Sequence, residues 1–450
     1  MSGAAVHTLV KPPRYFTPGV WVIAAVAAVG GLCWLYRMTF GLGAATHLSA
    51  AYPWGIWIGI DVACGVALAA GGFTSAFLAH LLHREAYHAV VRPALLTAAI
   101  GYTFVALGVM TDLGRYWAMW HVMMPSMWQP NSVLFEVAIC VMCYLTVLYI
   151  EFAPIVFERF IGRVSLPGLL GRLNGPVDGV LRFLDTVLGK VMTVFVVLGV
   201  LLSCMHQSSL GTLMVISGTK LHPLWQSPFL PLMFLLSAFA VGYPMVIFES
   251  VIAHRSLGLK VETKVLSLLA RYTPIILTLY LGVKVFDLFR RGVAGEVLAG
   301  TFASNLFIAE VTIGAILPIL IFAIPRFRRS VAGLFIGACL VILGLVMNRL
   351  DVFLIAYSPL DQAAHYTPSF MEIAVTAGFI ATMVLIYRFV VLNFPVIEEL
   401  DVPGRAAARE HAHAAGEPRA RELDASPDGE LEQIRVLRGR GLGAIAQGVK

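Results

Sequence analysis

Ten long apolar segments divide this 450-residue chain and constrain its fold more than any other feature. Each is about 20 residues long, the length a helix needs to cross the roughly 30 Å hydrocarbon core of a bilayer. Inside a bilayer only helices and closed barrels satisfy the backbone, and these runs lack the alternation of barrel strands. The sequence therefore predicts an all-α, polytopic membrane helix bundle. The predicted spans are approximately residues 19–40, 55–80, 93–111, 132–152, 188–206, 228–252, 266–288, 301–324, 330–348 and 371–394.

Composition supports the same class. Hydrophobic residues make up 59% of the chain and charged residues only 13%, against about 25% charged residues in soluble proteins. The formal net charge of +6 indicates no nucleic-acid partner, because the basic residues lie between apolar segments, as membrane topology requires. Membrane lipid is therefore predicted to surround most of the protein's surface.

Basic residues also predict the orientation. One alternating set of loops is rich in Arg and Lys, and the other set is poor, with loop 284–300 as the exception because it holds Lys284, Arg290 and Arg291. Basic loops stay in the cytoplasm, so both termini are predicted to be cytoplasmic. Residues 399–450 are polar, Ala-rich and dense in both charges, which predicts a cytoplasmic tail separate from a transmembrane domain of residues 1–398.

Acidic residues inside the predicted spans are candidates for a proton path. Charged groups at membrane depth are costly and usually functional. The predicted path comprises Asp61, Glu136, Glu151, Glu249 and Glu310. The alternative is that each acid pairs with a loop Arg or caps a helix, and for Glu151 and Glu249 the two interpretations are equally supported.

The loops on the predicted outer side combine Trp with His and polar residues. Aromatic walls with a few hydrogen-bonding groups describe a small-molecule pocket, and a quinone, which gains protons on reduction, has matching chemistry. His206 is the first candidate for a headgroup contact because the pKa of His suits proton transfer. The predicted quinone contacts are His206, Asp61, Glu136, Trp57, Trp120 and Gln207. An interfacial Trp belt and a structural His are the alternatives.

The stretch from Met110 to Trp120 follows an apolar run and holds Asp112 and Arg115. Asp112 and Arg115 are expected to pair with each other or with a neighbour and to hold the mouth of the quinone pocket. Their predicted role is positioning rather than chemistry.

Metal cofactors find little support in the sequence. Haem b needs two His residues at matched depth, whereas the His residues here are expected at helix ends or in loops. Cys140 and Cys143 have metal-binding spacing but stand alone in an apolar helix, and no four-cysteine iron–sulfur run is present. No haem, iron–sulfur cluster or other metal is predicted in this chain. The sequence also lacks a phosphate-binding glycine loop, so it does not predict ATP binding.

Several motifs in order resemble the NrfD/polysulfide-reductase family of membrane subunits over about residues 1–395. They include "YPWGIWIGIDVACGVALAAGGF", "HQSSLGTLMV", "KLHPLW" and "MNRLDVF". The resemblance is greatest to the branch that serves periplasmic [NiFe] hydrogenases. Two features depart from the family: the tail is longer than expected, and ten spans exceed the eight-helix family core.

This resemblance implies a haem-free, quinone-reactive anchor in the bacterial inner membrane. Its implied partners are a periplasmic four-cluster ferredoxin-like iron–sulfur subunit and catalytic hydrogenase subunits, with menaquinone or ubiquinone reduced near the outer face. Residues that match the family's polar positions are Asp61, Asp112, Arg115, Glu136 and His206. The leading hypothesis is therefore a quinone-reducing subunit of a respiratory oxidoreductase, with coupled proton translocation as its extension. The alternatives are a membrane subunit of a molybdopterin oxidoreductase, a passive anchor or a proton-coupled secondary transporter.

Overall fold

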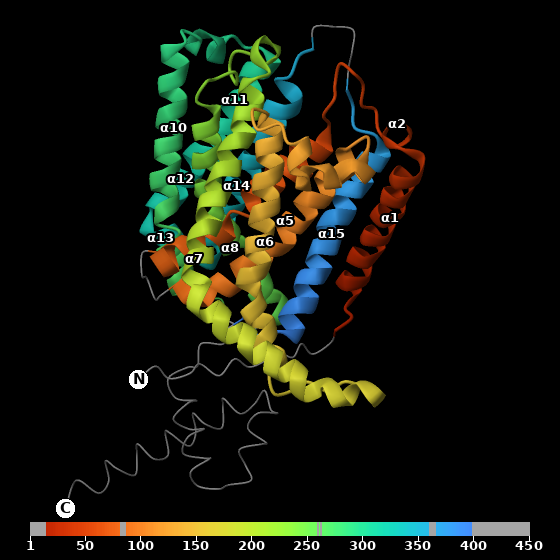
Figure 1. The fold of residues 1–450 in the computed structure, drawn as a ribbon. Coiled ribbons are helices and arrows are strands. Elements are labelled where there is room, and N and C mark those ends of the chain that lie inside the picture. Colours follow the sequence, from red (N-terminus) through yellow and green to blue (C-terminus); the bar gives the residue numbers. More distant parts are fainter. Residues whose placement is uncertain (1–14, 82–86, 259–260, 262, 360–365, 398–450) are drawn as a thin grey trace, which may run out of the picture. The chain divides into compact units, whose positions relative to one another are not determined.

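The computed structural model describes residues 15–81, 87–258, 261, 263–359 and 366–397. In this part every regular element is a helix, and loops connect them. The exception is one isolated β-bridge between Leu221 and Tyr357. The long helices run side by side, and α1 and α15 form one edge of the bundle (Figure 1). The predicted polar tail lies outside the described residues.

The helices longer than one turn, and the short helices that continue them, define the bundle. They are α1 Pro18–Phe40, α2 Leu42–Ala45, α3 Gly65–Leu68, α4 Gly71–Ala76, α5 His88–Asp112, α6 Val133–Phe160, α7 Asn174–Val215, α8 Leu230–Leu257, α9 Thr263–Leu269, α10 Tyr272–Arg290, α11 Phe302–Val311, α12 Leu317–Ala323, α13 Pro325–Arg328, α14 Val331–Leu350 and α15 Phe370–Asn393. The π-helical segments are η1 Trp57–Cys64, η2 Phe77–Leu81, η9 Thr312–Ile316 and η10 Asp351–Ile355. The 3₁₀ segments are η4 Tyr116–Met123, η5 Pro125–Met127, η6 Gly168–Leu173, η7 Gly218–Lys220 and η8 Ala294–Leu298.

Ten helical segments in the described residues are long and apolar enough to cross a membrane. This confirms the predicted all-α fold with ten spans. Helix starts agree closely where the sequence offers a Ser or Thr cap. Thr17, Ser132, Thr301, Ser330 and Ser369 each accept a backbone N–H in the first turn of the helix that follows, which satisfies a donor the helix cannot pair.

The largest difference from the sequence prediction concerns α7. Hydropathy predicts a span over 188–206, yet the helix runs from Asn174 to Val215. Its first turns are amphipathic and its last turns carry polar residues, so both ends have a lower hydropathy than the middle. As a consequence, His206 lies well inside the helix rather than at its end.

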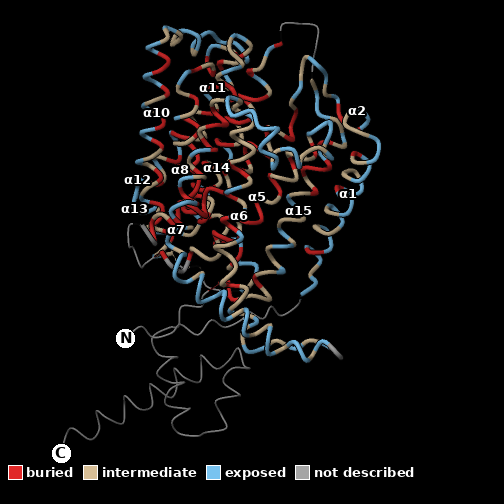
Figure 2. The backbone as a smooth tube through the Cα atoms, in the orientation of Figure 1, coloured by how far each residue is buried: buried red, intermediate tan, exposed pale blue. Residues whose placement is uncertain are grey.

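The buried core is centred on α8, α5 and the span from Trp57 to Ala79, while α1 is mostly exposed (Figure 2). Helix α1 packs against α15 through two glycines. A Cβ added to Gly30 would lie 2.5 Å from the Cα of Gly378, so the backbones touch, as small residues permit in membrane helices. The first and last spans thus form a pair at the edge of the bundle.

Candidate functional site

Helix α7 presents a polar stripe to its neighbours α5 and α6. Ser209, His206, Ser203 and Gly199 recur at intervals of three, three and four residues, which places them on one face of the helix. All four residues are buried. Through its contacts with α5 and α6, the stripe brings His206 together with predicted site residues of α6 that lie far from it in the sequence.

His206 is at the centre of the stripe and is fully buried. Its Nε2 forms a short hydrogen bond with the hydroxyl of Tyr102 on α5, and its Nδ1 lies 2.8 Å from the carbonyl oxygen of Leu202. The ring of Tyr144 on α6 packs against both, with centroids 4.6 Å from Tyr102 and 5.4 Å from His206. A Tyr–His pair of this kind can exchange a proton without moving its heavy atoms.

Two acids on α6 lie at the ends of the stripe. The Ser209 hydroxyl donates to Glu136 Oε1 at 2.5 Å. Ten residues earlier on α7, Gly199 makes room for Glu151, because a Cβ there would lie 2.8 Å from Glu151 Oε1. Glu136 and Glu151 are 15 residues apart, about 22 Å along the helix. The predicted residues Glu136, His206 and Glu151 therefore lie on one seam.

Two buried hydroxyls occupy the gap between His206 and Glu151. Ser203 lies next to Tyr102 and Tyr144, yet neither Ser203 Oγ nor the Tyr144 hydroxyl has a partner at hydrogen-bonding geometry among the described residues. Buried polar groups are normally paired, so such exceptions need an explanation. Hydroxyl protons rotate freely, so neither hydroxyl has a fixed donor direction. Tyr102, Tyr144 and Ser203 were not predicted from the sequence, since single Tyr and Ser residues in apolar helices carry no distinctive signal, and Ser209 stood out only as part of the motif that contains His206.

Asp61 and Trp57 lie in a second seam, against α15. Thr376 donates to Asp61 Oδ2 at 2.7 Å, and the Trp57 indole N–H donates to the carbonyl oxygen of Glu372 at 3.2 Å. Gln207 joins the two seams, because its side-chain amide donates to the Val66 carbonyl oxygen at 2.8 Å. Five of the six predicted quinone contacts are thus connected through the span from Trp57 to Ala79 and α7.

Arg115 and Trp120 lie apart from both seams, whereas Asp112, the last residue of α5, interacts electrostatically with Glu372 of the second seam. The basic residue that acts on Asp112 is Arg37 on α1 rather than Arg115. Arg37 is fully buried and donates to the carbonyl oxygens of Thr111 and Leu113, at 2.7 and 2.6 Å. The Arg115 side chain is exposed and makes no hydrogen bond or ion pair with the described residues, and Trp120 on η4 is 49% exposed. Asp112 forms no ion pair with Arg115 among the described residues, and its Oδ1 is buried without a hydrogen-bond partner there, so its pairing with a neighbour stays a prediction.

Above α15, Tyr366 closes the second seam. Its hydroxyl donates to Glu372 Oε1 at 2.6 Å and accepts the backbone N–H of Ile56 at 3.0 Å. Burial raises the pKa of the Tyr366 phenol well above its usual range, and the hydrogen bond to Glu372 acts in the same direction. Tyr366 is therefore a donor to Glu372 at every physiological pH.

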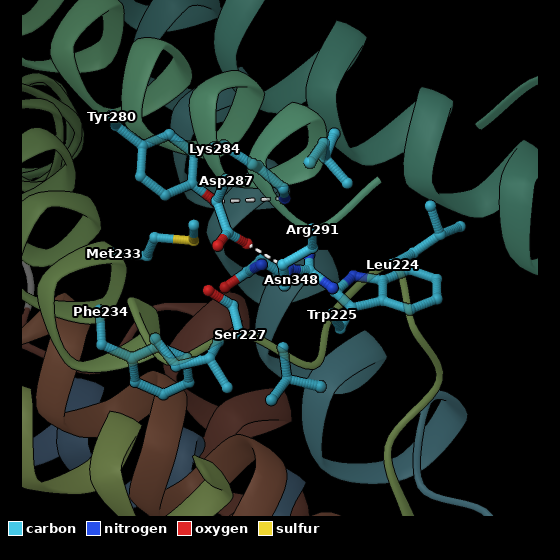
Figure 3. A pocket seen from close by; sticks show the side chains of 13 residues that line it. Leu224, Trp225, Ser227, Met233, Phe234, Tyr280, Lys284, Asp287, Arg291 and Asn348 are labelled. Carbon is cyan, nitrogen blue, oxygen red and sulfur yellow. Dashed lines mark hydrogen bonds and ion pairs between the residues drawn. The ribbon is translucent and has the colours of Figure 1, made fainter. Parts of the chain in front are cut away.

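Glu310 lies in a third polar cluster, in the second half of the chain. It forms a short ion pair with Lys284 on α10 and accepts hydrogen bonds from Trp225 at 2.9 Å and Asn348 at 3.0 Å. Arg349, also buried, donates to Asn348 at 2.6 Å. Beside the cluster is a small pocket of about 10 Å³, lined by Lys284, Asp287, Asn348 and neighbours (Figure 3). It has room for about one water molecule and is too small for a quinone ring.

This cluster corrects one part of the charge-topology argument. Lys284 and Arg349, which hydropathy assigns to loops, both lie inside membrane-length helices, with side chains almost completely buried. With Lys284 removed from loop 284–300, the exception to the basic-loop pattern is smaller. Hydropathy places both residues in loops because each helix continues past the most apolar part of its run, one to Arg290 and the other to Ile355.

Glu249 on α8 is buried among other helices rather than paired with a basic loop. Its neighbours are Thr97 on α5 and Tyr387 on α15, and its Oε1 has no partner at hydrogen-bonding geometry in the described part of the chain. No Arg or Lys of the described ranges pairs with it, so the loop Arg partner that the structural interpretation expected is not found among them.

Three of the π-helical segments contain or adjoin an acid of a membrane-length helix. Asp61 lies within η1, Glu310 precedes η9 by two residues, and Asp351 is the first residue of η10. Single π-turns are rare and frequently occur at functional sites, because the wide turn frees backbone groups and redirects side chains. Hydropathy carries no signal for them.

Several known proteins are similar in sequence to this chain. The profile of the family described as "Polysulphide reductase, NrfD" matches residues 45–360, which leaves the α1–α15 pair outside the matched segment. The chain is 35% identical over 367 residues to the probable Ni/Fe-hydrogenase 2 b-type cytochrome subunit of Escherichia coli (strain K12), covering 81% of this chain and 88% of that protein. It is 25% identical over 401 residues to the menaquinone reductase integral membrane subunit of Nitratidesulfovibrio vulgaris, covering 82% and 90%. It is 24% identical over 414 residues to a selenate reductase subunit of Mesobacillus selenatarsenatis, covering 86% and 94%.

Family membership together with ten apolar helices agrees with the predicted multi-pass location in the bacterial inner membrane. The sequence showed ten spans against an eight-helix family core. The two additional spans are α1 and α15, because both lie outside the matched segment. By both its sequence and its helices, this chain belongs to the NrfD polysulphide reductase family of integral membrane proteins.

Proposed function

We propose that this chain is the quinone-reactive membrane subunit of a respiratory oxidoreductase. Its relatives by name include a hydrogenase subunit and a menaquinone reductase subunit. The single observation that carries the proposal is the buried stripe on α7, where His206 meets Tyr102 between two acids. Such a stripe has no evident use in a passive anchor, because burying so many polar groups costs stability.

The proposed reaction is a two-electron reduction. A periplasmic iron–sulfur subunit delivers two electrons to menaquinone or ubiquinone, and each carbonyl oxygen takes one proton to give the quinol. His206, Gln207 and Glu136 would contact the headgroup from α7 and α6, and Asp61 and Trp57 from the neighbouring span. Trp120, Asp112 and Arg115 would lie at the partner-facing mouth.

The protons would move along α7. Basic residues Arg159, Arg163 and Arg172 lie near the Glu151 end of the seam, so that end is proposed to face the cytoplasm. A proton would pass from Glu151 through Ser203 and Tyr144 to the Tyr102–His206 pair, and then to Glu136. Protons taken from the cytoplasm would make turnover electrogenic.

Glu249 and Glu310 belong to the proposed path through different helices. Glu249 lies between α5, α8 and α15, with Thr97 and Tyr387 as its relay partners. Glu310 is held by Lys284 and Asn348, and Asp351 next to it is the proposed partner for its proton.

A haem is not part of the proposal, although the E. coli relative is named a b-type cytochrome subunit. Haem b held by two His residues needs both of them at matched depth on facing helices. Among the histidines whose side chains are described, His206 alone is fully buried, so these residues offer no second buried His opposite it. The sequence argument that placed every His at a helix end or in a loop was wrong for His206, which lies inside α7.

The catalytic partner proposed is a [NiFe] hydrogenase, since the hydrogenase relative has the higher identity over most of the chain. A molybdopterin oxidoreductase is the second candidate, supported by the match to a selenate reductase subunit. Purification of the native complex with identification of its large subunit decides between them.

His206→Ala tests the site in the assembled complex, with quinone reduction by the natural electron donor as the readout. His254→Ala is the matched control, because His254 also bonds to the carbonyl four residues earlier, Ser250 at 2.7 Å, but lies on α8 away from the stripe. The expected result is a loss of activity in the first variant and near-normal activity in the second. Unchanged activity and quinone affinity in His206→Ala would refute the headgroup assignment.

A further inference from the structure

Helix α7 is too long to be only a membrane span. Its 42 residues extend over about 63 Å, roughly twice the hydrocarbon thickness of a bilayer. Counting back from its end at Val215, about 20 residues account for the span, and its first turns lie beyond the end of α6. Figure 1 shows this part, the yellow helix, running sideways past the lower end of the bundle.

The first turns of α7 are amphipathic. One face carries seven aliphatic residues at the spacing of a helical stripe: Val177, Val180, Leu181, Leu184, Val187, Leu188 and Val191. The opposite face carries the charged and small residues: Asp178, Arg182, Asp185, Thr186, Gly189 and Lys190. This arrangement is typical of helices that lie in a membrane surface.

The described part of the chain leaves most of the apolar face uncovered: four of its seven side chains are exposed, and Val177, Leu181 and Leu188 are half-buried. Val180 is 57% exposed, and Leu184 and Val187 are each 39% exposed, and Figure 2 shows this segment largely as exposed. A stripe of this size facing water would be unfavourable, because aliphatic side chains are stabilised when they are removed from water.

The start of α7 is nevertheless held in place. Asp178 accepts the backbone N–H of Gly162 at 2.5 Å and pairs with Arg182 at 2.8 Å. The Asn174 side chain accepts the N–H of Leu166 at 2.9 Å. Gly162 has a φ of +73°, which favours glycine. These contacts fix the direction of the amphipathic segment relative to the end of α6.

We propose that residues 177–191 of α7 lie flat in the phospholipid headgroup region, with the aliphatic stripe facing the acyl chains. The occupant of the stripe is the bilayer itself, because the same helix continues into the membrane and lipid already surrounds its next turns. The charged face would lie among the headgroups, and Arg163 and Arg172 in the preceding turn can contact lipid phosphates. Anchored at the membrane surface in this way, the segment would set the depth and tilt of α7.

A second copy of the chain or another protein could also cover an aliphatic stripe, so the experiment must separate these occupants from lipid. The full-length protein, reconstituted in phosphatidylethanolamine–phosphatidylglycerol nanodiscs, would carry a fluorescent amino acid at one position. Position 184 reports on the aliphatic face. Position 186 is the matched control, because Thr186 is two residues away on the opposite face.

Lipids brominated in the upper acyl chain should quench the probe at 184 several times more strongly than the probe at 186. Equal quenching at the two positions would overturn the proposal. A benzophenone amino acid at 184 adds a second readout after illumination. A lipid adduct supports the assignment, whereas a dominant adduct to a second copy, another protein or residues 398–450 of this chain contradicts it.

Discussion

The hydroxyl of Tyr102 on α5 meets Nε2 of His206 on α7 at a place where both side chains are fully buried. Within the described residues, no ion pair involves either side chain. The pair lies on the same stripe as the contacts to Glu136 and Glu151 of α6, between the Ser209 and Gly199 positions where those two acids meet α7.

Replacing Tyr102 with Phe removes the hydroxyl but keeps the ring packing. Quinone reduction by the assembled complex should fall by about 10² if the pair passes protons, with about 1 kcal/mol of stability lost with the hydrogen bond. Tyr149→Phe is the control, because the Tyr149 hydroxyl bonds Thr103, also on α5, at 2.6 Å but on an exposed surface. Equal activity in the two variants would contradict a proton-transfer role.

Glu310→Gln leaves the Lys284 ammonium buried without its carboxylate. Removing one partner of a buried ion pair typically costs about 3–5 kcal/mol, so thermal unfolding in detergent should shift to a clearly lower temperature. The double variant Glu310→Gln with Lys284→Met should recover much of that loss. If the double variant is as unstable as the single one, the ion pair is not what stabilises this cluster.

Gly30→Leu introduces a side chain where the backbone of α15 lies. Overpacking of this kind costs about 1–3 kcal/mol or separates the helices, which a lower melting temperature and easier proteolysis between α14 and α15 would reveal. Gly31→Leu adds the same volume where nothing lies within 4 Å and should behave like the wild type. A similar response in both variants would mean that the α1–α15 contact is not tight in the membrane.

Arg115→Ala should leave the stability of the chain unchanged, because the Arg115 side chain is exposed and bonds to none of the described residues. If the loop faces the electron-donating partner, the variant should instead retain less iron–sulfur subunit on purification. Arg37→Met provides the contrast, since Arg37 holds two carbonyl groups at the end of α5 and its loss should lower the melting temperature. Normal assembly of Arg115→Ala would remove Arg115 from the interface.

The parts of the fold that follow from hydropathy and capping could be predicted. Spans next to a Ser or Thr cap, such as those after Ser330 and Ser369, begin within one residue of the predicted start. The ends of α7 could not, because an amphipathic extension and a polar stripe both lower mean hydropathy. The same limit placed His206 at a helix end and Lys284 in a loop.

The candidate site was predictable only in its charged members. Glu136, Glu151 and His206 were conspicuous because ionisable groups are rare in apolar helices. Tyr102, Ser203 and Ser209 were not, since their contribution depends on which helix faces which. That depends on packing between segments about 100 residues apart, as for Tyr102 and His206, and no local pattern contains it.

The contact between Gly30 and Gly378 also bears on how the protein is made. Among the described spans, α1 is the first to be synthesised, and α15, which packs against it, is the last. Until α15 is made, the glycine face of α1 lacks the partner that it has in the folded chain, so the pair can close only after the other described spans have been made. A chain that stops before α15 would carry an unmatched α1, and such incompletely folded chains are prone to misassembly.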